Sequence, residues 1–100
     1  MKYVHSRNSN EFKKIRNKAM RLGASKFDIS TKAYYKYYVV YNGRTIHIGH
    51  KKFSDFSWHK DEERKKRYHD RHKAILKKDG KPAYLDPNQK SYWSLNLLWT

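Results

Sequence analysis

The stretch AYYKYYVVY-NG-RTIHIG, residues 33–49, constrains the fold more than any other part of the chain. Two runs rich in aromatic and β-branched residues flank an Asn-Gly pair, and this pair accepts the positive φ angles of a type I′ turn. We therefore predict an antiparallel hairpin that turns at Asn42 and Gly43. Its register pairs Tyr41 with Arg44, Val40 with Thr45, Val39 with Ile46, Tyr38 with His47, and Tyr37 with Ile48.

Alternation along the two strands divides their side chains between two faces of the hairpin. We assign one face to the core, and it carries Tyr37, Val39, Ile46 and Ile48. We expect the other face to be half exposed, aromatic and basic, and it carries Lys36, Tyr38, Val40, Thr45 and His47. The preceding KFDIS, residues 26–30, is consistent with a short third strand at an edge.

Three helices are predicted around the hairpin. The first spans roughly Asn10 to Leu22, where apolar residues recur at helical spacing after a Ser9 or Asn8 cap. The second is long and basic, spans residues 61–78, and has three acidic residues in its first turn, where the helix dipole favours them. The third is short and aromatic, with Asp86 as N-cap and Pro87 at the first helical position.

These elements predict an α+β fold in a single domain spanning residues 1–100, with residues 1–9 as a flexible N-terminal arm. The terminal YWSLNLLWT, residues 92–100, holds two Trp and three Leu. We expect this segment to close the core, because such side chains are rarely left exposed. The alternative is a hydrophobic hook for another protein.

The charge balance limits what the chain can bind. Lys and Arg number 24 against nine acidic residues, which gives a formal net charge of +15 and a pI near 10.1. Self-repulsion at this density opposes compaction, so a polyanionic partner is the natural explanation. Sixteen per cent aromatic residues set the chain apart from disordered basic tails. No cysteine, secretory h-region or membrane-length apolar run is present, so we expect a non-secreted protein without a transmembrane segment.

Nucleic acid is the leading candidate, since Lys and Arg neutralise phosphates without reading sequence, and Tyr and Trp stack on bases. DNA is favoured over RNA, and the sequence leaves the oligomeric state open. A solvated face is the alternative interpretation of each basic helix. The predicted polyanion-binding residues are Lys13, Lys14, Arg16, Lys18, Arg21, Lys65, Lys66, Arg67, Lys73, Lys36, Tyr38 and His47.

Six histidines also suggest a metal-dependent nuclease of the hairpin-helix type. The hairpin resembles that of GIY-YIG nucleases, with HIG in place of YIG, and its order of parts resembles ββα-metal nucleases. The first family needs a late metal-binding Glu, yet no Glu follows Glu63; the second needs an Asn that is missing between His50 and the helix. We therefore assign no catalytic residue, no metal ligand and no cofactor, and expect a binding protein rather than an enzyme.

Three motifs resemble a family of small basic proteins of unknown function encoded by nucleocytoplasmic large DNA viruses. They are YNGRTIHIG (41–49), SDFSWHKDEERKKRYHDRH (54–72) and YWSLNLLW (92–99). The resemblance implies a viral protein, present in the virion or in the host cytoplasm or nucleus at the viral factory. It leaves two roles open, which are a nucleic-acid-binding virion component and a minor capsid protein that docks on acidic capsid or inner-membrane surfaces.

The residues shared with this family also have an architectural interpretation. They are Asn42, Gly43, Asp55, Trp58, His59, Asp61, Arg64, Tyr68, Arg71, His72, Trp93 and Trp99. In this interpretation Arg64 and Arg71 pair with Asp55 or stack on Trp58, while the outward cations carry binding. Replacement of Arg71 by Ala is then expected to unfold the protein, whereas charge reversal at Lys66 and Lys73 is expected only to weaken binding.

Overall fold

The hairpin predicted from the Asn-Gly pair forms the centre of a three-stranded antiparallel sheet. In the computed structural model, which describes residues 3–100, β2 (Tyr35–Tyr41) pairs with β3 (Arg44–His50) in the predicted register. Asn42 and Gly43 adopt φ angles of 51° and 73°, as a type I′ turn requires. The edge strand β1 (Lys26–Ile29) pairs with the other side of β2. The sheet is therefore confirmed in both its strands and its pairing.

The first helix, α1 (Asn10–Arg21), begins where the sequence predicts it. The Ser9 side chain accepts a hydrogen bond from the backbone N–H of Phe12 at 3.1 Å, and Gly23 follows the helix with a φ of +106°. The apolar face of α1 is buried and its opposite face is basic. This helix covers one part of the sheet, and Phe12 packs on Phe27 with ring centroids 5.3 Å apart.

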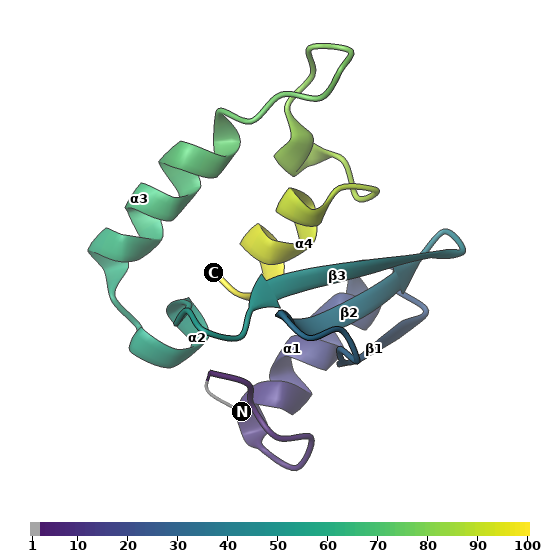
Figure 1. Cartoon of the computed structure of the whole chain (residues 1–100), viewed down its shortest axis with the longest axis vertical. Helices are drawn as coiled ribbons and strands as arrows, with labels where there is room; N and C mark the ends of the chain where they lie inside the picture. Colours follow the sequence, from purple (N-terminus) through teal and green to yellow (C-terminus); the bar gives the residue numbers. More distant parts are fainter. Residues whose placement is uncertain (1–2) are drawn as a thin grey trace.

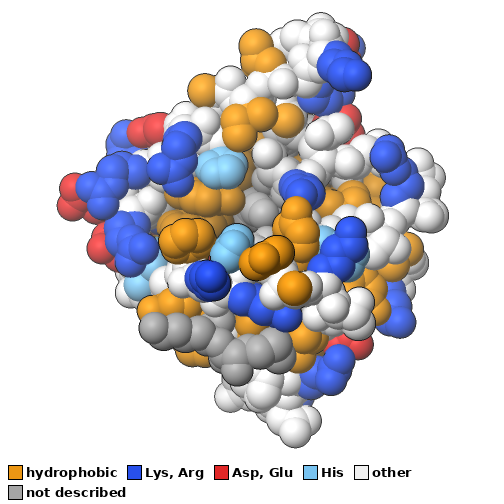
Figure 2. Space-filling view, in the orientation of Figure 1, with side chains coloured by type: hydrophobic (Ala, Val, Ile, Leu, Met, Phe, Trp, Pro, Cys, Tyr) orange, Lys and Arg blue, Asp and Glu red, His pale blue; other side chains and the backbone are white. Residues whose placement is uncertain are grey.

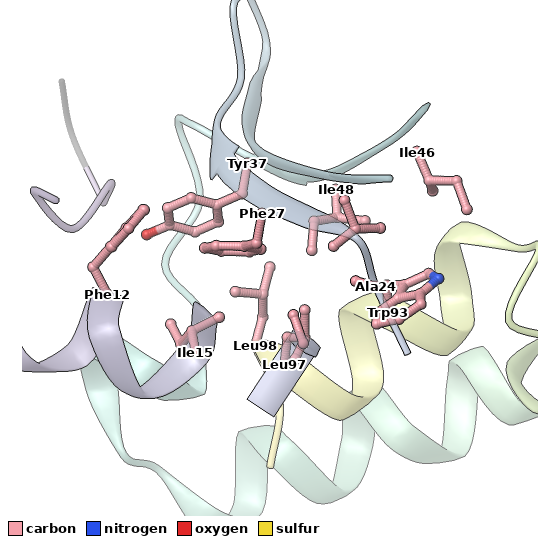
Figure 3. Packing of buried hydrophobic residues seen from close by; sticks show 12 residues of the cluster. Phe12, Ile15, Ala24, Phe27, Tyr37, Ile46, Ile48, Trp93, Leu97 and Leu98 are labelled. Atoms are coloured by element: carbon pink, nitrogen blue, oxygen red, sulfur yellow. The ribbon is translucent and has the colours of Figure 1, made fainter. Parts of the chain in front are cut away.

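The core lies between one face of the sheet and the two helices α1 and α4 (Lys90–Leu97). Figure 3 shows side chains from the three parts converging. Tyr37, Val39, Ile46 and Ile48 are buried on the predicted face, and Trp93, Leu97 and Leu98 meet them from the C-terminal segment. The C-terminal residues thus close the core, as expected, and Trp93 is fully buried.

Two helices follow the sheet and lead away from it. A short turn, α2 (Phe56–His59), precedes α3 (Glu62–Lys73), which lies beyond α4 as seen from the sheet (Figure 1). Asp61 caps α3 by accepting hydrogen bonds from the backbone N–H groups of Glu63 and Arg64. The α+β class and the order of elements agree with the prediction.

The end of α3 and the start of α4 both differ from the prediction. α3 ends at Lys73 rather than residue 78, because Leu76 forms a bridge with Pro82 and the Lys77 N–H donates to the Lys81 carbonyl. This small turn pulls Ile75 and Leu76 out of the helix and leaves both exposed.

Asp86 caps a turn instead of α4. It accepts from the Asn88 N–H at 2.9 Å, and the 3-10 turn η1 (Ala83–Leu85) precedes it. α4 therefore starts at Lys90, beyond the predicted N-cap.

The segment before α1 is packed on the domain instead of forming a free arm. His5 is 8% exposed, and its backbone N–H donates to the Tyr37 hydroxyl at 2.8 Å. Trp58 stacks on the His5 ring with centroids 4.0 Å apart. The first two residues of the predicted arm lie outside the described residues. Among residues 3–100, no helix combines the length and apolar character required to cross a membrane.

Candidate nucleic-acid interface

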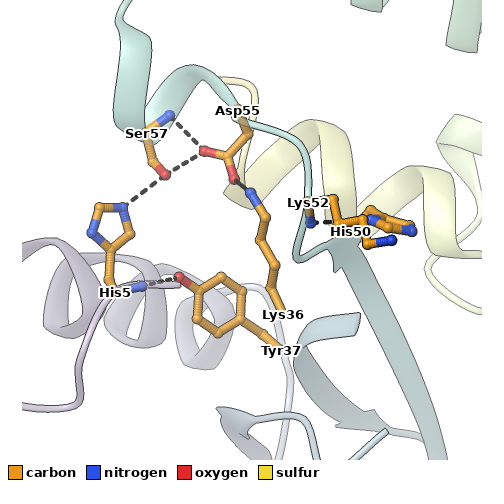
Figure 4. A network of polar contacts seen from close by, with 7 residues as sticks. All are labelled: His5, Lys36, Tyr37, His50, Lys52, Asp55 and Ser57. Carbon is orange, nitrogen blue, oxygen red and sulfur yellow. Dashed lines mark hydrogen bonds and ion pairs between the residues drawn. The ribbon is translucent and has the colours of Figure 1, made fainter. Parts of the chain in front are cut away.

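Lys36, predicted to be half exposed, is instead the most buried cation described. Its ammonium lies 2.6 Å from Asp55 Oδ2, and the two side chains are 1% and 3% exposed (Figure 4). Burial lowers the pKa of the Lys36 ammonium, and the neighbouring Asp55 carboxylate opposes that effect. The pair holds the connector after β3 against the beginning of β2. Lys36 is therefore a structural residue and is removed from the predicted binding set.

Gly49 explains why strand alternation failed at Lys36. Gly49 has a φ of +74°, so β3 departs from regular extended geometry opposite this position. A Cβ on Gly49 would lie 3.0 Å from both Lys36 Cδ and Leu98 Cδ1. The missing side chain thus leaves the space that the Lys36 stem occupies on its way to Asp55. The sequence motif ending in Gly49 reflects this close approach.

The other oxygen of Asp55 organises a second set of polar groups, also drawn in Figure 4. It accepts from the Ser57 backbone N–H at 2.8 Å and from the Ser57 hydroxyl. His5 Nε2 lies 3.0 Å from that hydroxyl, and burial lowers the pKa of the His5 ring. Ser57 stands between the acid and the histidine, whereas a hydrolase triad needs the histidine in the middle. This network therefore fastens the N-terminal segment to α2.

A cleft opens between α3 and the end of β3, and we call it the α3 cleft. Arg64, Tyr68 and Arg71 follow one another at helical spacing along one side of α3 and line it. The Tyr68 ring stacks on Trp99 with centroids 4.0 Å apart, and His72 stacks on its other side at 3.9 Å. His69 Nε2 donates to the Trp99 carbonyl oxygen, which fixes the end of the chain in this stack. In Figure 2 apolar side chains lie in the hollow beside α3, bordered by basic and histidine side chains.

The opposite wall of the α3 cleft comes from the connector after β3. His50 and Phe53 lie there, 4.9 Å apart between ring centroids, and Phe53 is 66% exposed. The Lys36–Asp55 pair lies at the floor. The cleft has a volume of about 310 Å³. This space is at the lower end of the range of small-molecule sites, which is roughly 300–1,000 Å³.

The charges of the α3 cleft are unbalanced. Among residues 3–100, neither Arg64 nor Arg71 has a carboxylate within ion-pair distance. The Arg71 guanidinium lies 5.7 Å from the Tyr68 ring centroid instead. Because Lys36 already occupies Asp55, the predicted Arg–Asp55 pair is absent. Both arginines are exposed, so they face solvent with their positive charge available.

The outward cations of α3 have acidic neighbours instead. Lys66 donates to Asp70 at 2.8 Å, Arg67 to Glu63 at 3.2 Å, and Lys65 lies 3.5 Å from Glu62. The fourth predicted cation, Lys73, lies over the Tyr84 ring at 5.5 Å. The left edge of Figure 2 shows the resulting mixture of blue and red side chains. The predicted binding set on α3 is thus mostly paired within the helix.

The basic face of α1 borders a second groove, of about 360 Å³, which we call the α1 groove. Lys14, Lys18, Arg21 and Lys60 line it with a single acid, Glu11, which lies 3.7 Å from Lys14 and 3.6 Å from Lys60. Burial lowers the pKa of Lys18, and the charges of Arg21 and Lys65 act in the same direction. The remaining predicted cations, Lys13 and Arg16, are exposed on α1.

The two grooves lie on either side of the last residues of the chain. Leu97 and Thr100 line the α1 groove, and Leu98 and Trp99 line the α3 cleft. Since Lys65 is close enough to influence Lys18, positive charge extends from one groove toward the other. We call the cations that line the two grooves the basic surface of α1 and α3.

The remaining predicted residues lie apart from this surface or support it. Tyr38 and His47 are neighbours on the outer face of the sheet, with ring centroids 5.8 Å apart, and His47 Nδ1 bonds to Ser30 Oγ at 2.8 Å. The His59 ring lies 5.2 Å from Trp99 and accepts from the Asp61 N–H through Nδ1. Within residues 3–100, no three His, Asp or Glu side chains are grouped as a metal site requires.

Sequence reasoning missed His50 and Phe53 as site residues. Phe53 follows Lys51 and Lys52 in a polar connector, and an isolated aromatic residue among cations is a signal that it is kept exposed. His5 was missed because its partner, Ser57, is distant in sequence.

Part of the chain matches a known family model. Residues 25–72 match the model of a family of unknown function, DUF5754. The matched stretch begins just before β1 and ends within α3, so it contains the hairpin, Asp55, Arg64 and Arg71. No curated protein and no solved structure matches the chain.

Proposed function

We propose that this protein binds nucleic acid through its phosphates, without strong sequence preference. The observation that carries this proposal is the pair of arginines in the α3 cleft, which flank stacked aromatic rings and have no carboxylate of residues 3–100 within ion-pair distance. Guanidinium groups bind phosphate with two parallel hydrogen bonds, and aromatic rings accept bases of any sequence. The cations of the α1 groove supply further phosphate contacts.

The charge arithmetic supports the same proposal. Nine acids cannot neutralise 24 cations, and the ion pairs within residues 3–100 already engage Asp55, Asp70, Glu63 and most of the other acids. The excess positive charge therefore remains available to an external polyanion. A role in a virion or viral factory rests on the sequence resemblance alone.

The test is a titration of labelled random-sequence duplex DNA across a range of salt concentrations, read by fluorescence anisotropy. If about six phosphates are engaged, the logarithm of the affinity falls against the logarithm of salt with a slope of about −5. Absence of binding at low salt removes the proposal. The absorbance ratio at 260 and 280 nm of protein purified from its source gives an independent check.

We keep docking on a capsid protein as a second candidate function, and a separate observation supports an apolar contact with a protein partner. Ile75, Leu76 and Leu85 are exposed around the turn that follows α3, at 43%, 60% and 63%. Replacement of Leu76 and Leu85 by Asp is expected to lower recovery in purified particles and to leave DNA binding unchanged. Unchanged recovery in particles contradicts this second role.

A further inference from the structure

The walls of the α3 cleft differ in chemistry, and one of them offers a contact that phosphate binding does not use. One wall holds two cations and a stack of aromatic rings, and the other holds Phe53, which is 66% exposed. A ligand that packs on this exposed aromatic ring removes its apolar surface from water, and this burial favours binding. Duplex DNA presents phosphates and groove edges to a protein, whereas a single strand also presents the flat faces of its bases.

We propose that the α3 cleft binds one unpaired nucleotide of a single strand, with its base packed on Phe53 beside the Tyr68–Trp99 stack and its phosphates on Arg64 and Arg71. This inference rests on the proposed function and specifies which form of nucleic acid the cleft takes. DNA and RNA share the required chemistry, a base face beside a phosphate.

The dimensions and chemistry of the cleft agree with this occupant. A volume of about 310 Å³ accommodates a single small ligand, whereas a double helix does not fit inside the cleft and reaches only the exposed arginines at its rim. The two arginines are seven residues apart on one helix face, which separates their Cα atoms by roughly 10 Å along the helix axis. They therefore reach successive phosphates on either side of a bound nucleotide.

The floor of the cleft does not compete for the phosphate. Lys36 and Asp55 neutralise each other at 2.6 Å, and Ser57 occupies the second carboxylate oxygen. The positive charge that remains for a ligand thus comes from the two arginines at the rim. A base that packs on Phe53 therefore meets a neutral ion pair at the floor of the cleft and not an unpaired charge.

The test compares four labelled probes by fluorescence anisotropy: oligo(dT), oligo(U), an abasic strand of the same length, and random-sequence duplex. The abasic strand keeps the phosphates and lacks the bases. We expect oligo(dT) or oligo(U) to bind about tenfold more tightly than the abasic strand, because stacking of one base on an aromatic ring adds to the phosphate contacts. The comparison of oligo(dT) with oligo(U) shows whether the cleft binds the DNA strand or the RNA strand more tightly.

A matched pair of variants locates the effect. Phe53→Ala is expected to remove the advantage of oligo(dT) or oligo(U) over the abasic strand. Tyr34→Ala is the control, because Tyr34 is 64% exposed and also lies beside His50 but does not line the cleft. Both side chains are exposed, so neither variant is expected to unfold, and circular dichroism checks this.

The outcomes separate this inference from the proposed function. If duplex and abasic strands bind as tightly as oligo(dT) and oligo(U), and Phe53→Ala changes nothing, the protein binds phosphates but the single-nucleotide site is wrong. If none of the probes binds at low salt, the proposed function and this inference fail together. An equal loss in Phe53→Ala and Tyr34→Ala also contradicts the site.

Discussion

The two sides of α3 differ in their cations and in the acids beside them, with two cations lining the cleft and four on the outward side. Arg64 and Arg71 are seven residues apart on the side that lines the cleft, and neither has a carboxylate partner among the described residues. Lys66 and Lys73 have the same spacing on the outward side, and Asp70 lies between them, bonded to Lys66 at 2.8 Å. A cation count does not identify a binding surface; the distribution of the acids does.

The largest expected effect on stability is at Lys36, the buried cation at the floor of the cleft. Lys36→Met leaves Asp55 buried and unpaired, and we expect it to lower the free energy of unfolding by about 3–5 kcal/mol. Urea denaturation measures the change. Lys66→Met breaks an exposed pair on the outward side and is the matched control, expected to leave the midpoint unchanged. Equal midpoints for the two variants contradict the structural role of Lys36.

A second prediction concerns the close approach at Gly49. Gly49→Ala is expected to cost about 1–3 kcal/mol, because its φ of +74° is unfavourable for Ala and the new Cβ meets Lys36 and Leu98 at 3.0 Å. Gly43→Ala is the control, since Gly43 has a similar φ of +73° and no atom within 4 Å of its Cβ position. Thermal unfolding compares them, and a smaller loss at Gly49 than at Gly43 contradicts the proposed crowding.

The stability contributed by each side of α3 is expected to depend on pH in a different range. Burial lowers the pKa of His72 in the cleft stack below its ordinary value of 6.5, so the unfolded chain binds more protons than the folded one. The stability that His72 contributes is therefore present above pH 6.5 and is lost as the pH falls below it. His5 and His59 act in the same direction.

The outward side responds only to stronger acid. Lys66 lowers the pKa of Asp70 below 3.8, so the contribution of this carboxylate persists above that pH and is lost below it. Melting temperatures between pH 8 and pH 5 are expected to fall in the parent protein and to fall less in His72→Gln, whereas Asp70→Asn keeps the parent's slope. A flat parent curve is inconsistent with this assignment.

The smallest expected effect on stability is at Arg71. The sequence suggested that Arg71→Ala unfolds the protein, yet Arg71 is exposed and its described contact is with the Tyr68 ring. We expect a loss of about 1 kcal/mol or less, the range of an exposed cation–π contact. Denaturation by urea tests this expectation. If Arg71→Ala does not fold, Arg71 has the architectural role that the sequence predicts.

Local patterns predicted the framework of the fold because each depends on neighbouring residues. The Asn42–Gly43 turn set the register of the hairpin, and Ser9 and Asp61 cap the helices that follow them. Alternation also assigned Tyr37 and Ile48 to the core correctly.

The candidate site depended on contacts that no local pattern contains. Strand alternation predicted an exposed outer position for Lys36, but its side chain is buried and bonds to Asp55, 19 residues later, in the space left by Gly49. Once Asp55 is occupied, Arg64 and Arg71 lose the partner that the architectural interpretation assigned to them. The sequence predicts phosphate binding by the outward cations of α3, whereas the lack of acidic partners around Arg64 and Arg71 in the described part of the chain leads us to propose the inner cations instead.

The central claim is that the inner cations of α3, rather than the outward ones, contact phosphate. The most direct measurement is the salt dependence of duplex DNA affinity for Arg64→Ala/Arg71→Ala and for the equally spaced control Lys66→Ala/Lys73→Ala. We predict that the first variant loses about two units of the log–log slope, roughly 0.9 for each phosphate contact, and that the control keeps the parent's slope. Equal losses, or a larger loss in the control, contradict the account.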